Sequence, residues 1–244
     1  MSTINQQLGT TDSQEDSLAS VKCWIGKSRK WAESFFSELN RLKNVKTVVL
    51  LGSTIRQRVH PRSDFDILLV YEGVEPPKVN APIEVDLRMY SANELDKKLG
   101  ERDEILCWAL KYGIVAFDSD GLWASLAVKV GDQIPLPSRA EAESRGRKSL
   151  NRAIEMLDNH DEEAADDLVL AALTQIARGI LIAWNVFPAS RPELPSQLRS
   201  LFPHHPVADV LDEAMFGNSS PSKLIDKAKL LIDQLSRSDS IPKH

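Results

Sequence analysis

The sequence predicts a small α/β domain followed by a helical bundle. Short apolar runs typical of β-strands occur in the first half of the chain. Beyond residue 138, every strong apolar periodicity is that of a helix. Between these parts, residues 131–138 (GDQIPLPS) concentrate glycine and proline, which indicates a linker. We therefore expect a disordered N-terminus over residues 1–17, one domain over 18–130 and a second over 138–237.

The elements of the first domain follow from the spacing of its apolar residues. A helical period predicts a first helix over residues 17–43. Continuous or alternating apolar segments predict four strands, at residues 46–51, 65–71, 82–90 and 114–118. Two helices are expected between the last two strands, at 91–99 and 101–112. The first of them is predicted to begin with a Ser91–Glu94 capping box.

Five helices are predicted in the second domain, separated by proline residues. They cover residues 140–157, 163–184, 194–201, 207–215 and 222–236. The most apolar stretch, 168–187, is broken by Gln175 and Arg178. This pattern is typical of a buried helix rather than of a membrane span.

Composition and charge indicate which classes of protein this sequence can belong to. Of the 244 residues, 42% are hydrophobic and 27% charged, as in an ordinary globular protein. The net charge is −5 and neither half has an excess of basic residues, which disfavours a nucleic-acid partner. Cys23 and Cys107 match no metal-ligand spacing and are typical of reduced cysteines. With no signal peptide in the first residues, we expect a cytoplasmic protein without membrane attachment.

One stretch, LLGSTIRQRVHPRSDFDILLV, carries the chemically informative residues. A buried strand ends at Gly52-Ser53, and Asp64 and Asp66 follow at the start of the next strand. Residues two apart in a strand lie on the same face, so the two aspartates project together while Phe65 faces a core. Adjacent carboxylates repel unless a cation lies between them, and hard oxygen ligands at this spacing suit Mg²⁺.

The third predicted strand offers a second pair of acids, Glu84 and Asp86, with the same alternation. If this strand neighbours the second, one or both acids complete a carboxylate cluster that can hold two ions. Upstream, Gly52 allows close approach of the backbone to phosphate, and Ser53 adds a hydroxyl and an N–H donor. The intervening segment supplies suitable counter-charges for a triphosphate, namely Arg56, Arg58 and Arg62.

This pattern resembles the minimal nucleotidyltransferase domain of the DNA polymerase beta-like superfamily. The signature of that family is an hG[GS] turn, a D-x-D strand and a later single acid, matched here by Leu51-Gly52-Ser53, Asp64-Phe65-Asp66 and Asp86. The resemblance covers roughly residues 22–130. It implies a mixed sheet with helices packed on it, two Mg²⁺ ions on the three aspartates, and nucleotide phosphates held at the Gly-Ser turn. Relatives often continue the turn as Ala-Arg-Gly, whereas Ile55-Arg56-Gln57 keeps only the arginine.

The second domain resembles the helical C-terminal domains fused to such nucleotidyltransferases, like that of kanamycin nucleotidyltransferase, and the HEPN-type bundles. The resemblance rests on residues 171–198, with SRPEL at 190–194. In such fusions the bundle usually walls the cleft and supplies acceptor contacts. No motif fixes the general base, for which the candidates are Asp86, Glu84 and three bundle glutamates, Glu141, Glu143 and Glu193.

The same residues also have interpretations that involve no function. A D-x-D pair can be a solvated strand start, and Glu84 or Asp86 can be a solvated partner of Arg88. The Gly-Ser turn upstream and the acid downstream favour a site. Arg199 and His204 have the R-x4-H spacing of HEPN ribonucleases, but Pro203 disfavours one helix presenting both, so we interpret the spacing as a coincidence.

The expected function is Mg²⁺-dependent, adenylyltransferase-type transfer of a nucleoside monophosphate from an NTP, ATP in preference, to an acceptor hydroxyl with release of pyrophosphate. An acidic chain suits a cationic aminoglycoside acceptor, and the HEPN-like bundle suits a protein side chain. An RNA 3′ end is disfavoured by charge, and the sequence allows an oligomer. The alternative is a nucleotide-binding antitoxin-like or regulatory partner protein without turnover.

Overall fold

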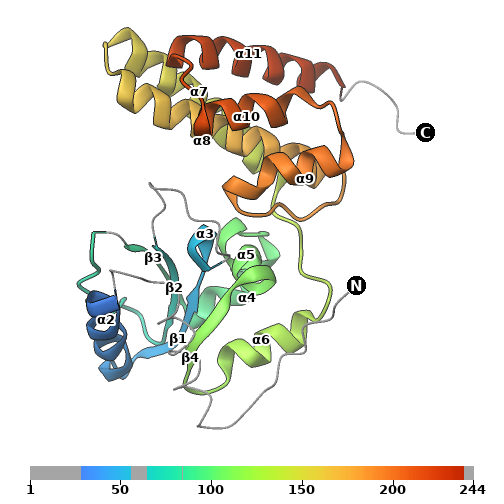
Figure 1. The fold of residues 1–244 in the computed structure, drawn as a ribbon. Coiled ribbons are helices and arrows are strands. Elements are labelled where there is room, and N and C mark those ends of the chain that lie inside the picture. The colour runs from blue at the N-terminus through green and yellow to red at the C-terminus, as the bar shows by residue number, and fades with distance from the viewer. Residues whose placement is uncertain (1–28, 56–64, 84, 239–244) are drawn as a thin grey trace. The chain divides into compact units, whose positions relative to one another are not determined.

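A computed structural model describes residues 29–55, 65–83 and 85–238 (Figure 1). The chain divides into two compact units between Pro135 and Leu136. In the described residues each unit has its own apolar core, and the two cores share no residue. The first unit contains the sheet and the second is helical, which confirms the predicted α+β arrangement followed by a bundle.

The first unit is built on a four-stranded mixed sheet in the order β3-β2-β1-β4. Its strands are β1 (Val45–Leu50), β2 (Phe65–Tyr71), β3 (Val85–Ser91) and β4 (Ile114–Asp118). Strand β1 is antiparallel to both β2 and β4, whereas β2 and β3 are parallel. The mixed sheet implied by the family resemblance is therefore present, with β3 and β4 as its edges.

Helices cover both faces of this sheet (Figure 1). Helix α2 (Arg29–Arg41) packs Phe35, Phe36 and Leu39 against alternate residues of β2, which include Ile67 and Leu69. Helices α4 (Leu95–Gly100) and α5 (Glu104–Tyr112) lie on the other side. The apolar alternation of β2 thus fixes which of its residues face α2 and leaves Asp66 on the opposite face.

Helix α5 holds the described cysteine and begins later than predicted. Asp103 accepts a hydrogen bond from the Leu106 backbone N–H (2.9 Å) and so caps the helix, which starts at Glu104 rather than at Glu101. Cys107 is fully buried, and burial raises the pKa of its thiol to about 12. It therefore stays a neutral packing residue, whereas Cys23 lies outside the described residues.

The start of α4 corrects one detail of the sequence analysis. Ser91 makes no side-chain capping hydrogen bond, because it is the last residue of β3 and is buried. A short 3-10 turn (Ala92–Glu94) leads into α4 instead. The predicted capping box is therefore absent, although a helix does follow.

Two helices were not predicted. Helix α3 (Gly52–Ile55) follows β1 directly. Helix α6 (Leu122–Val130) follows β4, and its first N–H groups are satisfied by that strand: the Asp118 carboxylate accepts from the backbone N–H of Trp123 (3.1 Å) and of Ala124 (3.1 Å). The Thr47 hydroxyl also donates to Asp118 (2.9 Å), which joins β1, β4 and α6.

The described residues of the second unit, up to Ser238, form five main helices, all within two residues of the predicted bounds. They are α7 (Arg139–Asp158), α8 (Glu162–Ala183), α9 (Leu194–Leu201), α10 (Pro206–Phe216) and α11 (Pro221–Ser238), with a 3-10 turn (Arg191–Glu193) before α9. Helices α7 and α8 lie side by side (Figure 1). At Gly146 of α7, an added Cβ would lie 3.5 Å from the Ala172 carbonyl oxygen of α8, which is an ordinary van der Waals distance. Among the described residues, no helix has the length and apolar character required to cross a membrane.

Candidate functional site

The predicted site residues that the structure describes gather at one end of the sheet. Strand β1 ends where the antiparallel β2 begins, and the Leu51 backbone N–H donates to the Asp66 carbonyl oxygen (2.9 Å). Strand β3 is parallel to β2 and starts at the same end, with Asp86 opposite Asp66 in the register. The topology therefore brings together Gly52, which follows β1, and two acids that lie far apart in the sequence.

Gly52 is required at its position for two separate reasons. Its φ angle is +83°, a left-handed conformation that disfavours residues with a side chain. In addition, a Cβ on this residue would lie 2.0 Å from the Asp66 Oδ2 atom and 2.9 Å from its Cγ. The carboxylate of Asp66 thus lies directly against the backbone where α3 begins, which is where the sequence analysis expects phosphates.

Asp66 owes its orientation to the alternation of β2. Its neighbours Phe65 and Ile67 are 5% and 0% exposed and belong to the core beneath α2. Asp66 is half-buried on the opposite face of the strand. A half-buried carboxylate at the end of a sheet is in reach of a ligand while its backbone is held in the sheet.

Asp86 lies on the same face of the sheet as Asp66. Its side chain is 38% exposed and accepts a hydrogen bond from the Arg88 guanidinium at 2.8 Å. Paired strands are about 4.8 Å apart, so the two aspartates are close enough for their charges to repel. Two hard carboxylates at one register position fit a divalent cation such as Mg²⁺.

Several predicted residues lie outside the described part of the chain. These are Arg56, Arg58, Arg62, Asp64 and Glu84, and for Ser53 only the backbone, within α3, is described. In residues 29–55, 65–83 and 85–238, no three His, Cys, Asp or Glu side chains gather as metal ligands. The described part of the predicted cluster is therefore the Asp66–Asp86 pair, and Asp64 and Glu84 remain predictions.

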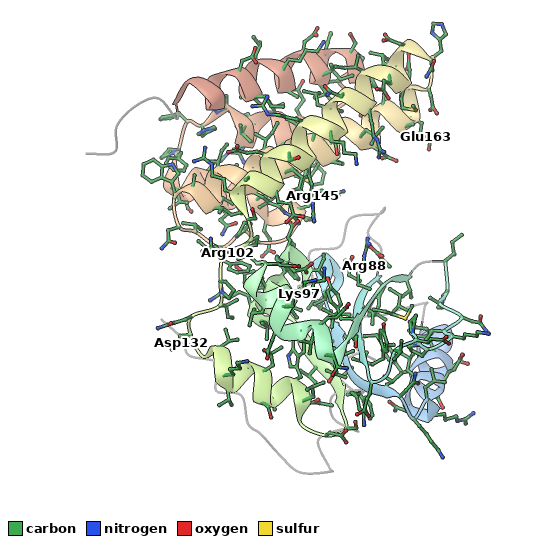
Figure 2. All side chains as sticks on the ribbon, turned by 180° about the vertical axis from the view of Figure 1, so that it is seen from behind. Arg88, Lys97, Arg102, Asp132, Arg145 and Glu163 are labelled. Carbon is green, nitrogen blue, oxygen red and sulfur yellow. The ribbon has the colours of Figure 1, made fainter. Side chains whose placement is uncertain are left out.

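The three bundle glutamates considered as a general base all have partners inside the bundle. Glu141 pairs with Arg145 (labelled in Figure 2), and Glu143 pairs with Arg139 at 2.6 Å. Glu193 accepts hydrogen bonds from the backbone N–H (3.3 Å) and the hydroxyl of Ser190. Each therefore has a structural role in the helix that carries it or at the start of α9.

The R-x4-H spacing does not form a paired site in the described structure. Helix α9 ends at Leu201, so Arg199 and His204 do not lie on one continuous helix. Arg199 instead binds two acids of α10, Asp209 at 2.7 Å and Asp212 at 2.6 Å. The hydrogen bonds with Asp209 and Asp212 raise the pKa of the Arg199 guanidinium above its ordinary value.

The plainer interpretation of Asp86 agrees with the structure. It made Asp86 or Glu84 a solvated partner of Arg88, and the Arg88 guanidinium donates to Asp86 while both side chains are exposed. The signal was present, because residues 86 and 88 alternate onto one face of the same strand.

The mixed sheet thus brings a glycine turn and two strand-borne acids to one end. Residues 30–115 match the family model described as "Nucleotidyltransferase domain", a range that includes Gly52, Asp66 and Asp86. This confirms the resemblance drawn from the sequence, and residues 30–115 are a nucleotidyltransferase domain followed by a helical C-terminal region. The domain supports a transferase that moves nucleoside monophosphates.

The chain is similar to a solved structure of a nucleotidyltransferase-like protein from Exiguobacterium sibiricum 255-15. The superposition covers 84% of this chain and 73% of the other, with 16% sequence identity and a TM-score of 0.43. No curated protein matches the sequence.

Proposed function

We propose that this protein is a Mg²⁺-dependent nucleotidyltransferase of the adenylyl-transferring type, which moves a nucleoside monophosphate from ATP to an acceptor hydroxyl and releases pyrophosphate. The observation that supports it most directly is the arrangement of three residues: Asp66 opposite Asp86 on paired strands, and Gly52 against the Asp66 carboxylate. This arrangement lies within the matched nucleotidyltransferase range.

In this proposal the acids form the cation site. Asp64, Asp66 and Asp86 would hold two Mg²⁺ ions, which supply charge neutralisation at the triphosphate and lower the pKa of the acceptor hydroxyl. The backbone of Asp66 is held by strand pairing and by the Leu51 N–H, which donates to the Asp66 carbonyl oxygen, so the place of its side chain on the sheet is fixed. Asp64 would share its face because of its spacing in the sequence.

The turn after β1 would position the nucleotide. Gly52 exposes its backbone to an approaching phosphate, Ser53 adds donors, and Arg56 adds a positive charge. After the acceptor oxygen attacks the α-phosphorus, the negative charge of the departing pyrophosphate is stabilised at this same turn. Asp86 or Glu84 would accept the proton of the acceptor hydroxyl.

The acceptor is proposed from the charge of the chain and the presence of the bundle. A net charge of −5 suits a cationic small molecule such as an aminoglycoside. A protein side-chain hydroxyl is the second acceptor, suggested by the HEPN-like helical unit. An RNA 3′ end is disfavoured, because neither half of the chain has an excess of basic residues.

An acceptor screen tests this proposal. The protein is incubated with Mg²⁺ and α-labelled ATP, CTP, GTP or UTP in the presence of aminoglycosides, a protein extract or tRNA. We expect label from ATP in an aminoglycoside or a protein, together with pyrophosphate. Asp66→Asn and Asp86→Asn should abolish the transfer. Asp132→Asn, the same change at an exposed linker residue, should not (Figure 2). Nucleotide binding without transfer to any acceptor would instead favour the partner-protein alternative.

A further inference from the structure

Arg88 provides a positive charge at the described acid pair. It follows Asp86 by two residues on β3, so both side chains lie on one face of the strand, and its guanidinium donates to the Asp86 Oδ2 at 2.8 Å. Within the described part of the chain, Arg88 is the cation that contacts this carboxylate. Figure 2 marks the position of Arg88 on β3.

The pair is also free to separate. Strand β3 is an edge of the sheet, and the side chains of Arg88 and Asp86 are 57% and 38% exposed. Exposed ion pairs contribute little to stability, since water solvates both partners when they part. Separating Arg88 from Asp86 therefore costs little free energy, whereas separating a buried ion pair costs much more.

A guanidinium and a divalent cation compete for the same carboxylate. Arg88 occupies an oxygen of Asp86, and Asp86 stands opposite Asp66 in the register. When Arg88 leaves Asp86, its charge remains beside the site, on the face that carries both acids. A triphosphate bound there has the polyanionic, multi-oxygen chemistry that a guanidinium fork binds best.

We propose that Arg88 is the resident counter-ion of the acid pair: it neutralises Asp86 in the empty site, a divalent cation displaces it, and it then binds the triphosphate of the nucleotide. This rests on the proposed function. Arg88 would be a positioning residue for metal loading and a nucleotide-binding residue afterwards. It would lower the affinity for metal alone and raise the affinity for nucleotide, two effects of opposite sign.

The test measures both affinities in the full-length protein. Binding of Mn²⁺ alone is followed by electron paramagnetic resonance of the free ion, and binding of α,β-methylene-ATP at saturating Mg²⁺ by calorimetry. Arg88→Met should bind Mn²⁺ about two- to fivefold more tightly than the original protein, and the nucleotide analogue several-fold more weakly. Arg88→Lys, which keeps the charge but not the guanidinium fork, should bind Mn²⁺ as the original protein does and the nucleotide analogue with an affinity between those of the original protein and Arg88→Met.

Two further variants separate the possible outcomes. Lys129→Met removes the same charge from another exposed ion pair, with Asp96 at 2.7 Å, and should change neither affinity. Asp86→Asn should weaken Mn²⁺ binding. If Asp86→Asn weakens Mn²⁺ binding but Arg88→Met does not tighten it, the role proposed for Arg88 is contradicted and the proposed function stands. If Asp86→Asn binds Mn²⁺ as the original protein does, the metal site of the proposed function fails. A loss of both affinities in Arg88→Met would indicate a structural role and overturn the inference.

Discussion

The carboxylate of Asp66 occupies the space that a side chain on Gly52 would need. The two residues belong to different elements, since Gly52 starts α3 after β1 and Asp66 lies in β2. Their contact joins the turn expected to hold phosphate to one of the expected metal ligands. A change at either residue therefore affects both parts of the candidate site.

Gly52→Ala is expected to abolish nucleotide transfer and to destabilise the protein. The new Cβ would lie 2.0 Å from Asp66 Oδ2, and the φ of +83° adds backbone strain of about 1–3 kcal/mol. Gly121→Ala is the matched control, because Gly121 has a φ of +66° and no atom within 4 Å of the added Cβ. We expect thermal melts to show a larger loss for Gly52→Ala, and transfer activity to survive only in the control. Equal losses of stability would contradict the steric argument.

Asp66→Asn is expected to leave the fold intact while it removes the response to Mg²⁺. Asparagine has nearly the same shape and relieves the repulsion from Asp86, so the melting temperature in EDTA should not fall. Added Mg²⁺ should raise the melting temperature of the original protein through binding to the folded state, but not that of the variant. Transfer activity should fall at least about 100-fold, as when one preorganised stabilising group is lost. A Mg²⁺-dependent shift that persists in Asp66→Asn would argue against a metal at this residue.

The stability of the bundle is expected to decrease below about pH 6.5 because of His205. His205 caps α10 by accepting a hydrogen bond from the Val207 N–H at 3.3 Å, and burial lowers the pKa of its imidazole. The unfolded chain therefore binds the proton more readily than the folded one. The contribution of His205 to the free energy of unfolding is fully present above pH 6.5 and is lost as the pH falls through the lowered folded-state pKa.

His205→Asn tests this dependence, because asparagine caps a helix without titrating near this pH. The difference in melting temperature between pH 7.5 and pH 5.5 should be smaller in this variant than in the original protein. His204→Asn, a change at the exposed neighbouring histidine, should leave that difference unaltered. The prediction fails if the two variants behave alike.

Gly146→Ala is expected to stabilise the bundle by about 0.5–1 kcal/mol. Alanine is the better helix former, and the added Cβ would make ordinary contacts of 3.5 Å with Ala172 and Gln175 of α8. Gly113→Ala is the opposite case, since its Cβ would lie 2.4 Å from the Ala109 carbonyl oxygen and 2.5 Å from Val49. Denaturant unfolding should show a gain for the first variant and a loss for the second. A loss in both would mean that α7 and α8 are packed too tightly for any added atom.

The sequence predicts best those elements whose signal is local and periodic. The strands at 65–71 and 114–118 have the predicted bounds, and the bundle helices differ by at most two residues at either end. Helix α6 was missed because Leu122–Val130 has no clear polar stripe and is begun by the Asp118 carboxylate of the preceding strand. The Ser91 capping box fails for a related reason, since that residue is buried as part of β3.

In the candidate site, too, local sequence patterns were predicted and contacts between strands were not. The Gly-Ser turn and the D-x-D spacing are local patterns, so the sequence alone could single out Gly52 and Asp66. The opposition of Asp66 and Asp86 depends on the pairing and register of β2 and β3, which the sequence analysis could state only as a condition. The approach of the Asp66 carboxylate to Gly52 depends on how β2 pairs with β1 and on the turn that follows β1. The spacing of residues in the sequence does not contain that information.

The separate cores of the two units have a consequence for how this protein can change its specificity. Apolar side chains from residue 150 onward form one described cluster, and those up to residue 117 form the other. A substitution within the described cluster of the helical unit therefore changes none of the apolar residues in the cluster beneath Asp66. If the proposed function holds, we expect chimaeras that exchange everything after the Gly- and Pro-containing connector to keep nucleotide transfer and to change the acceptor.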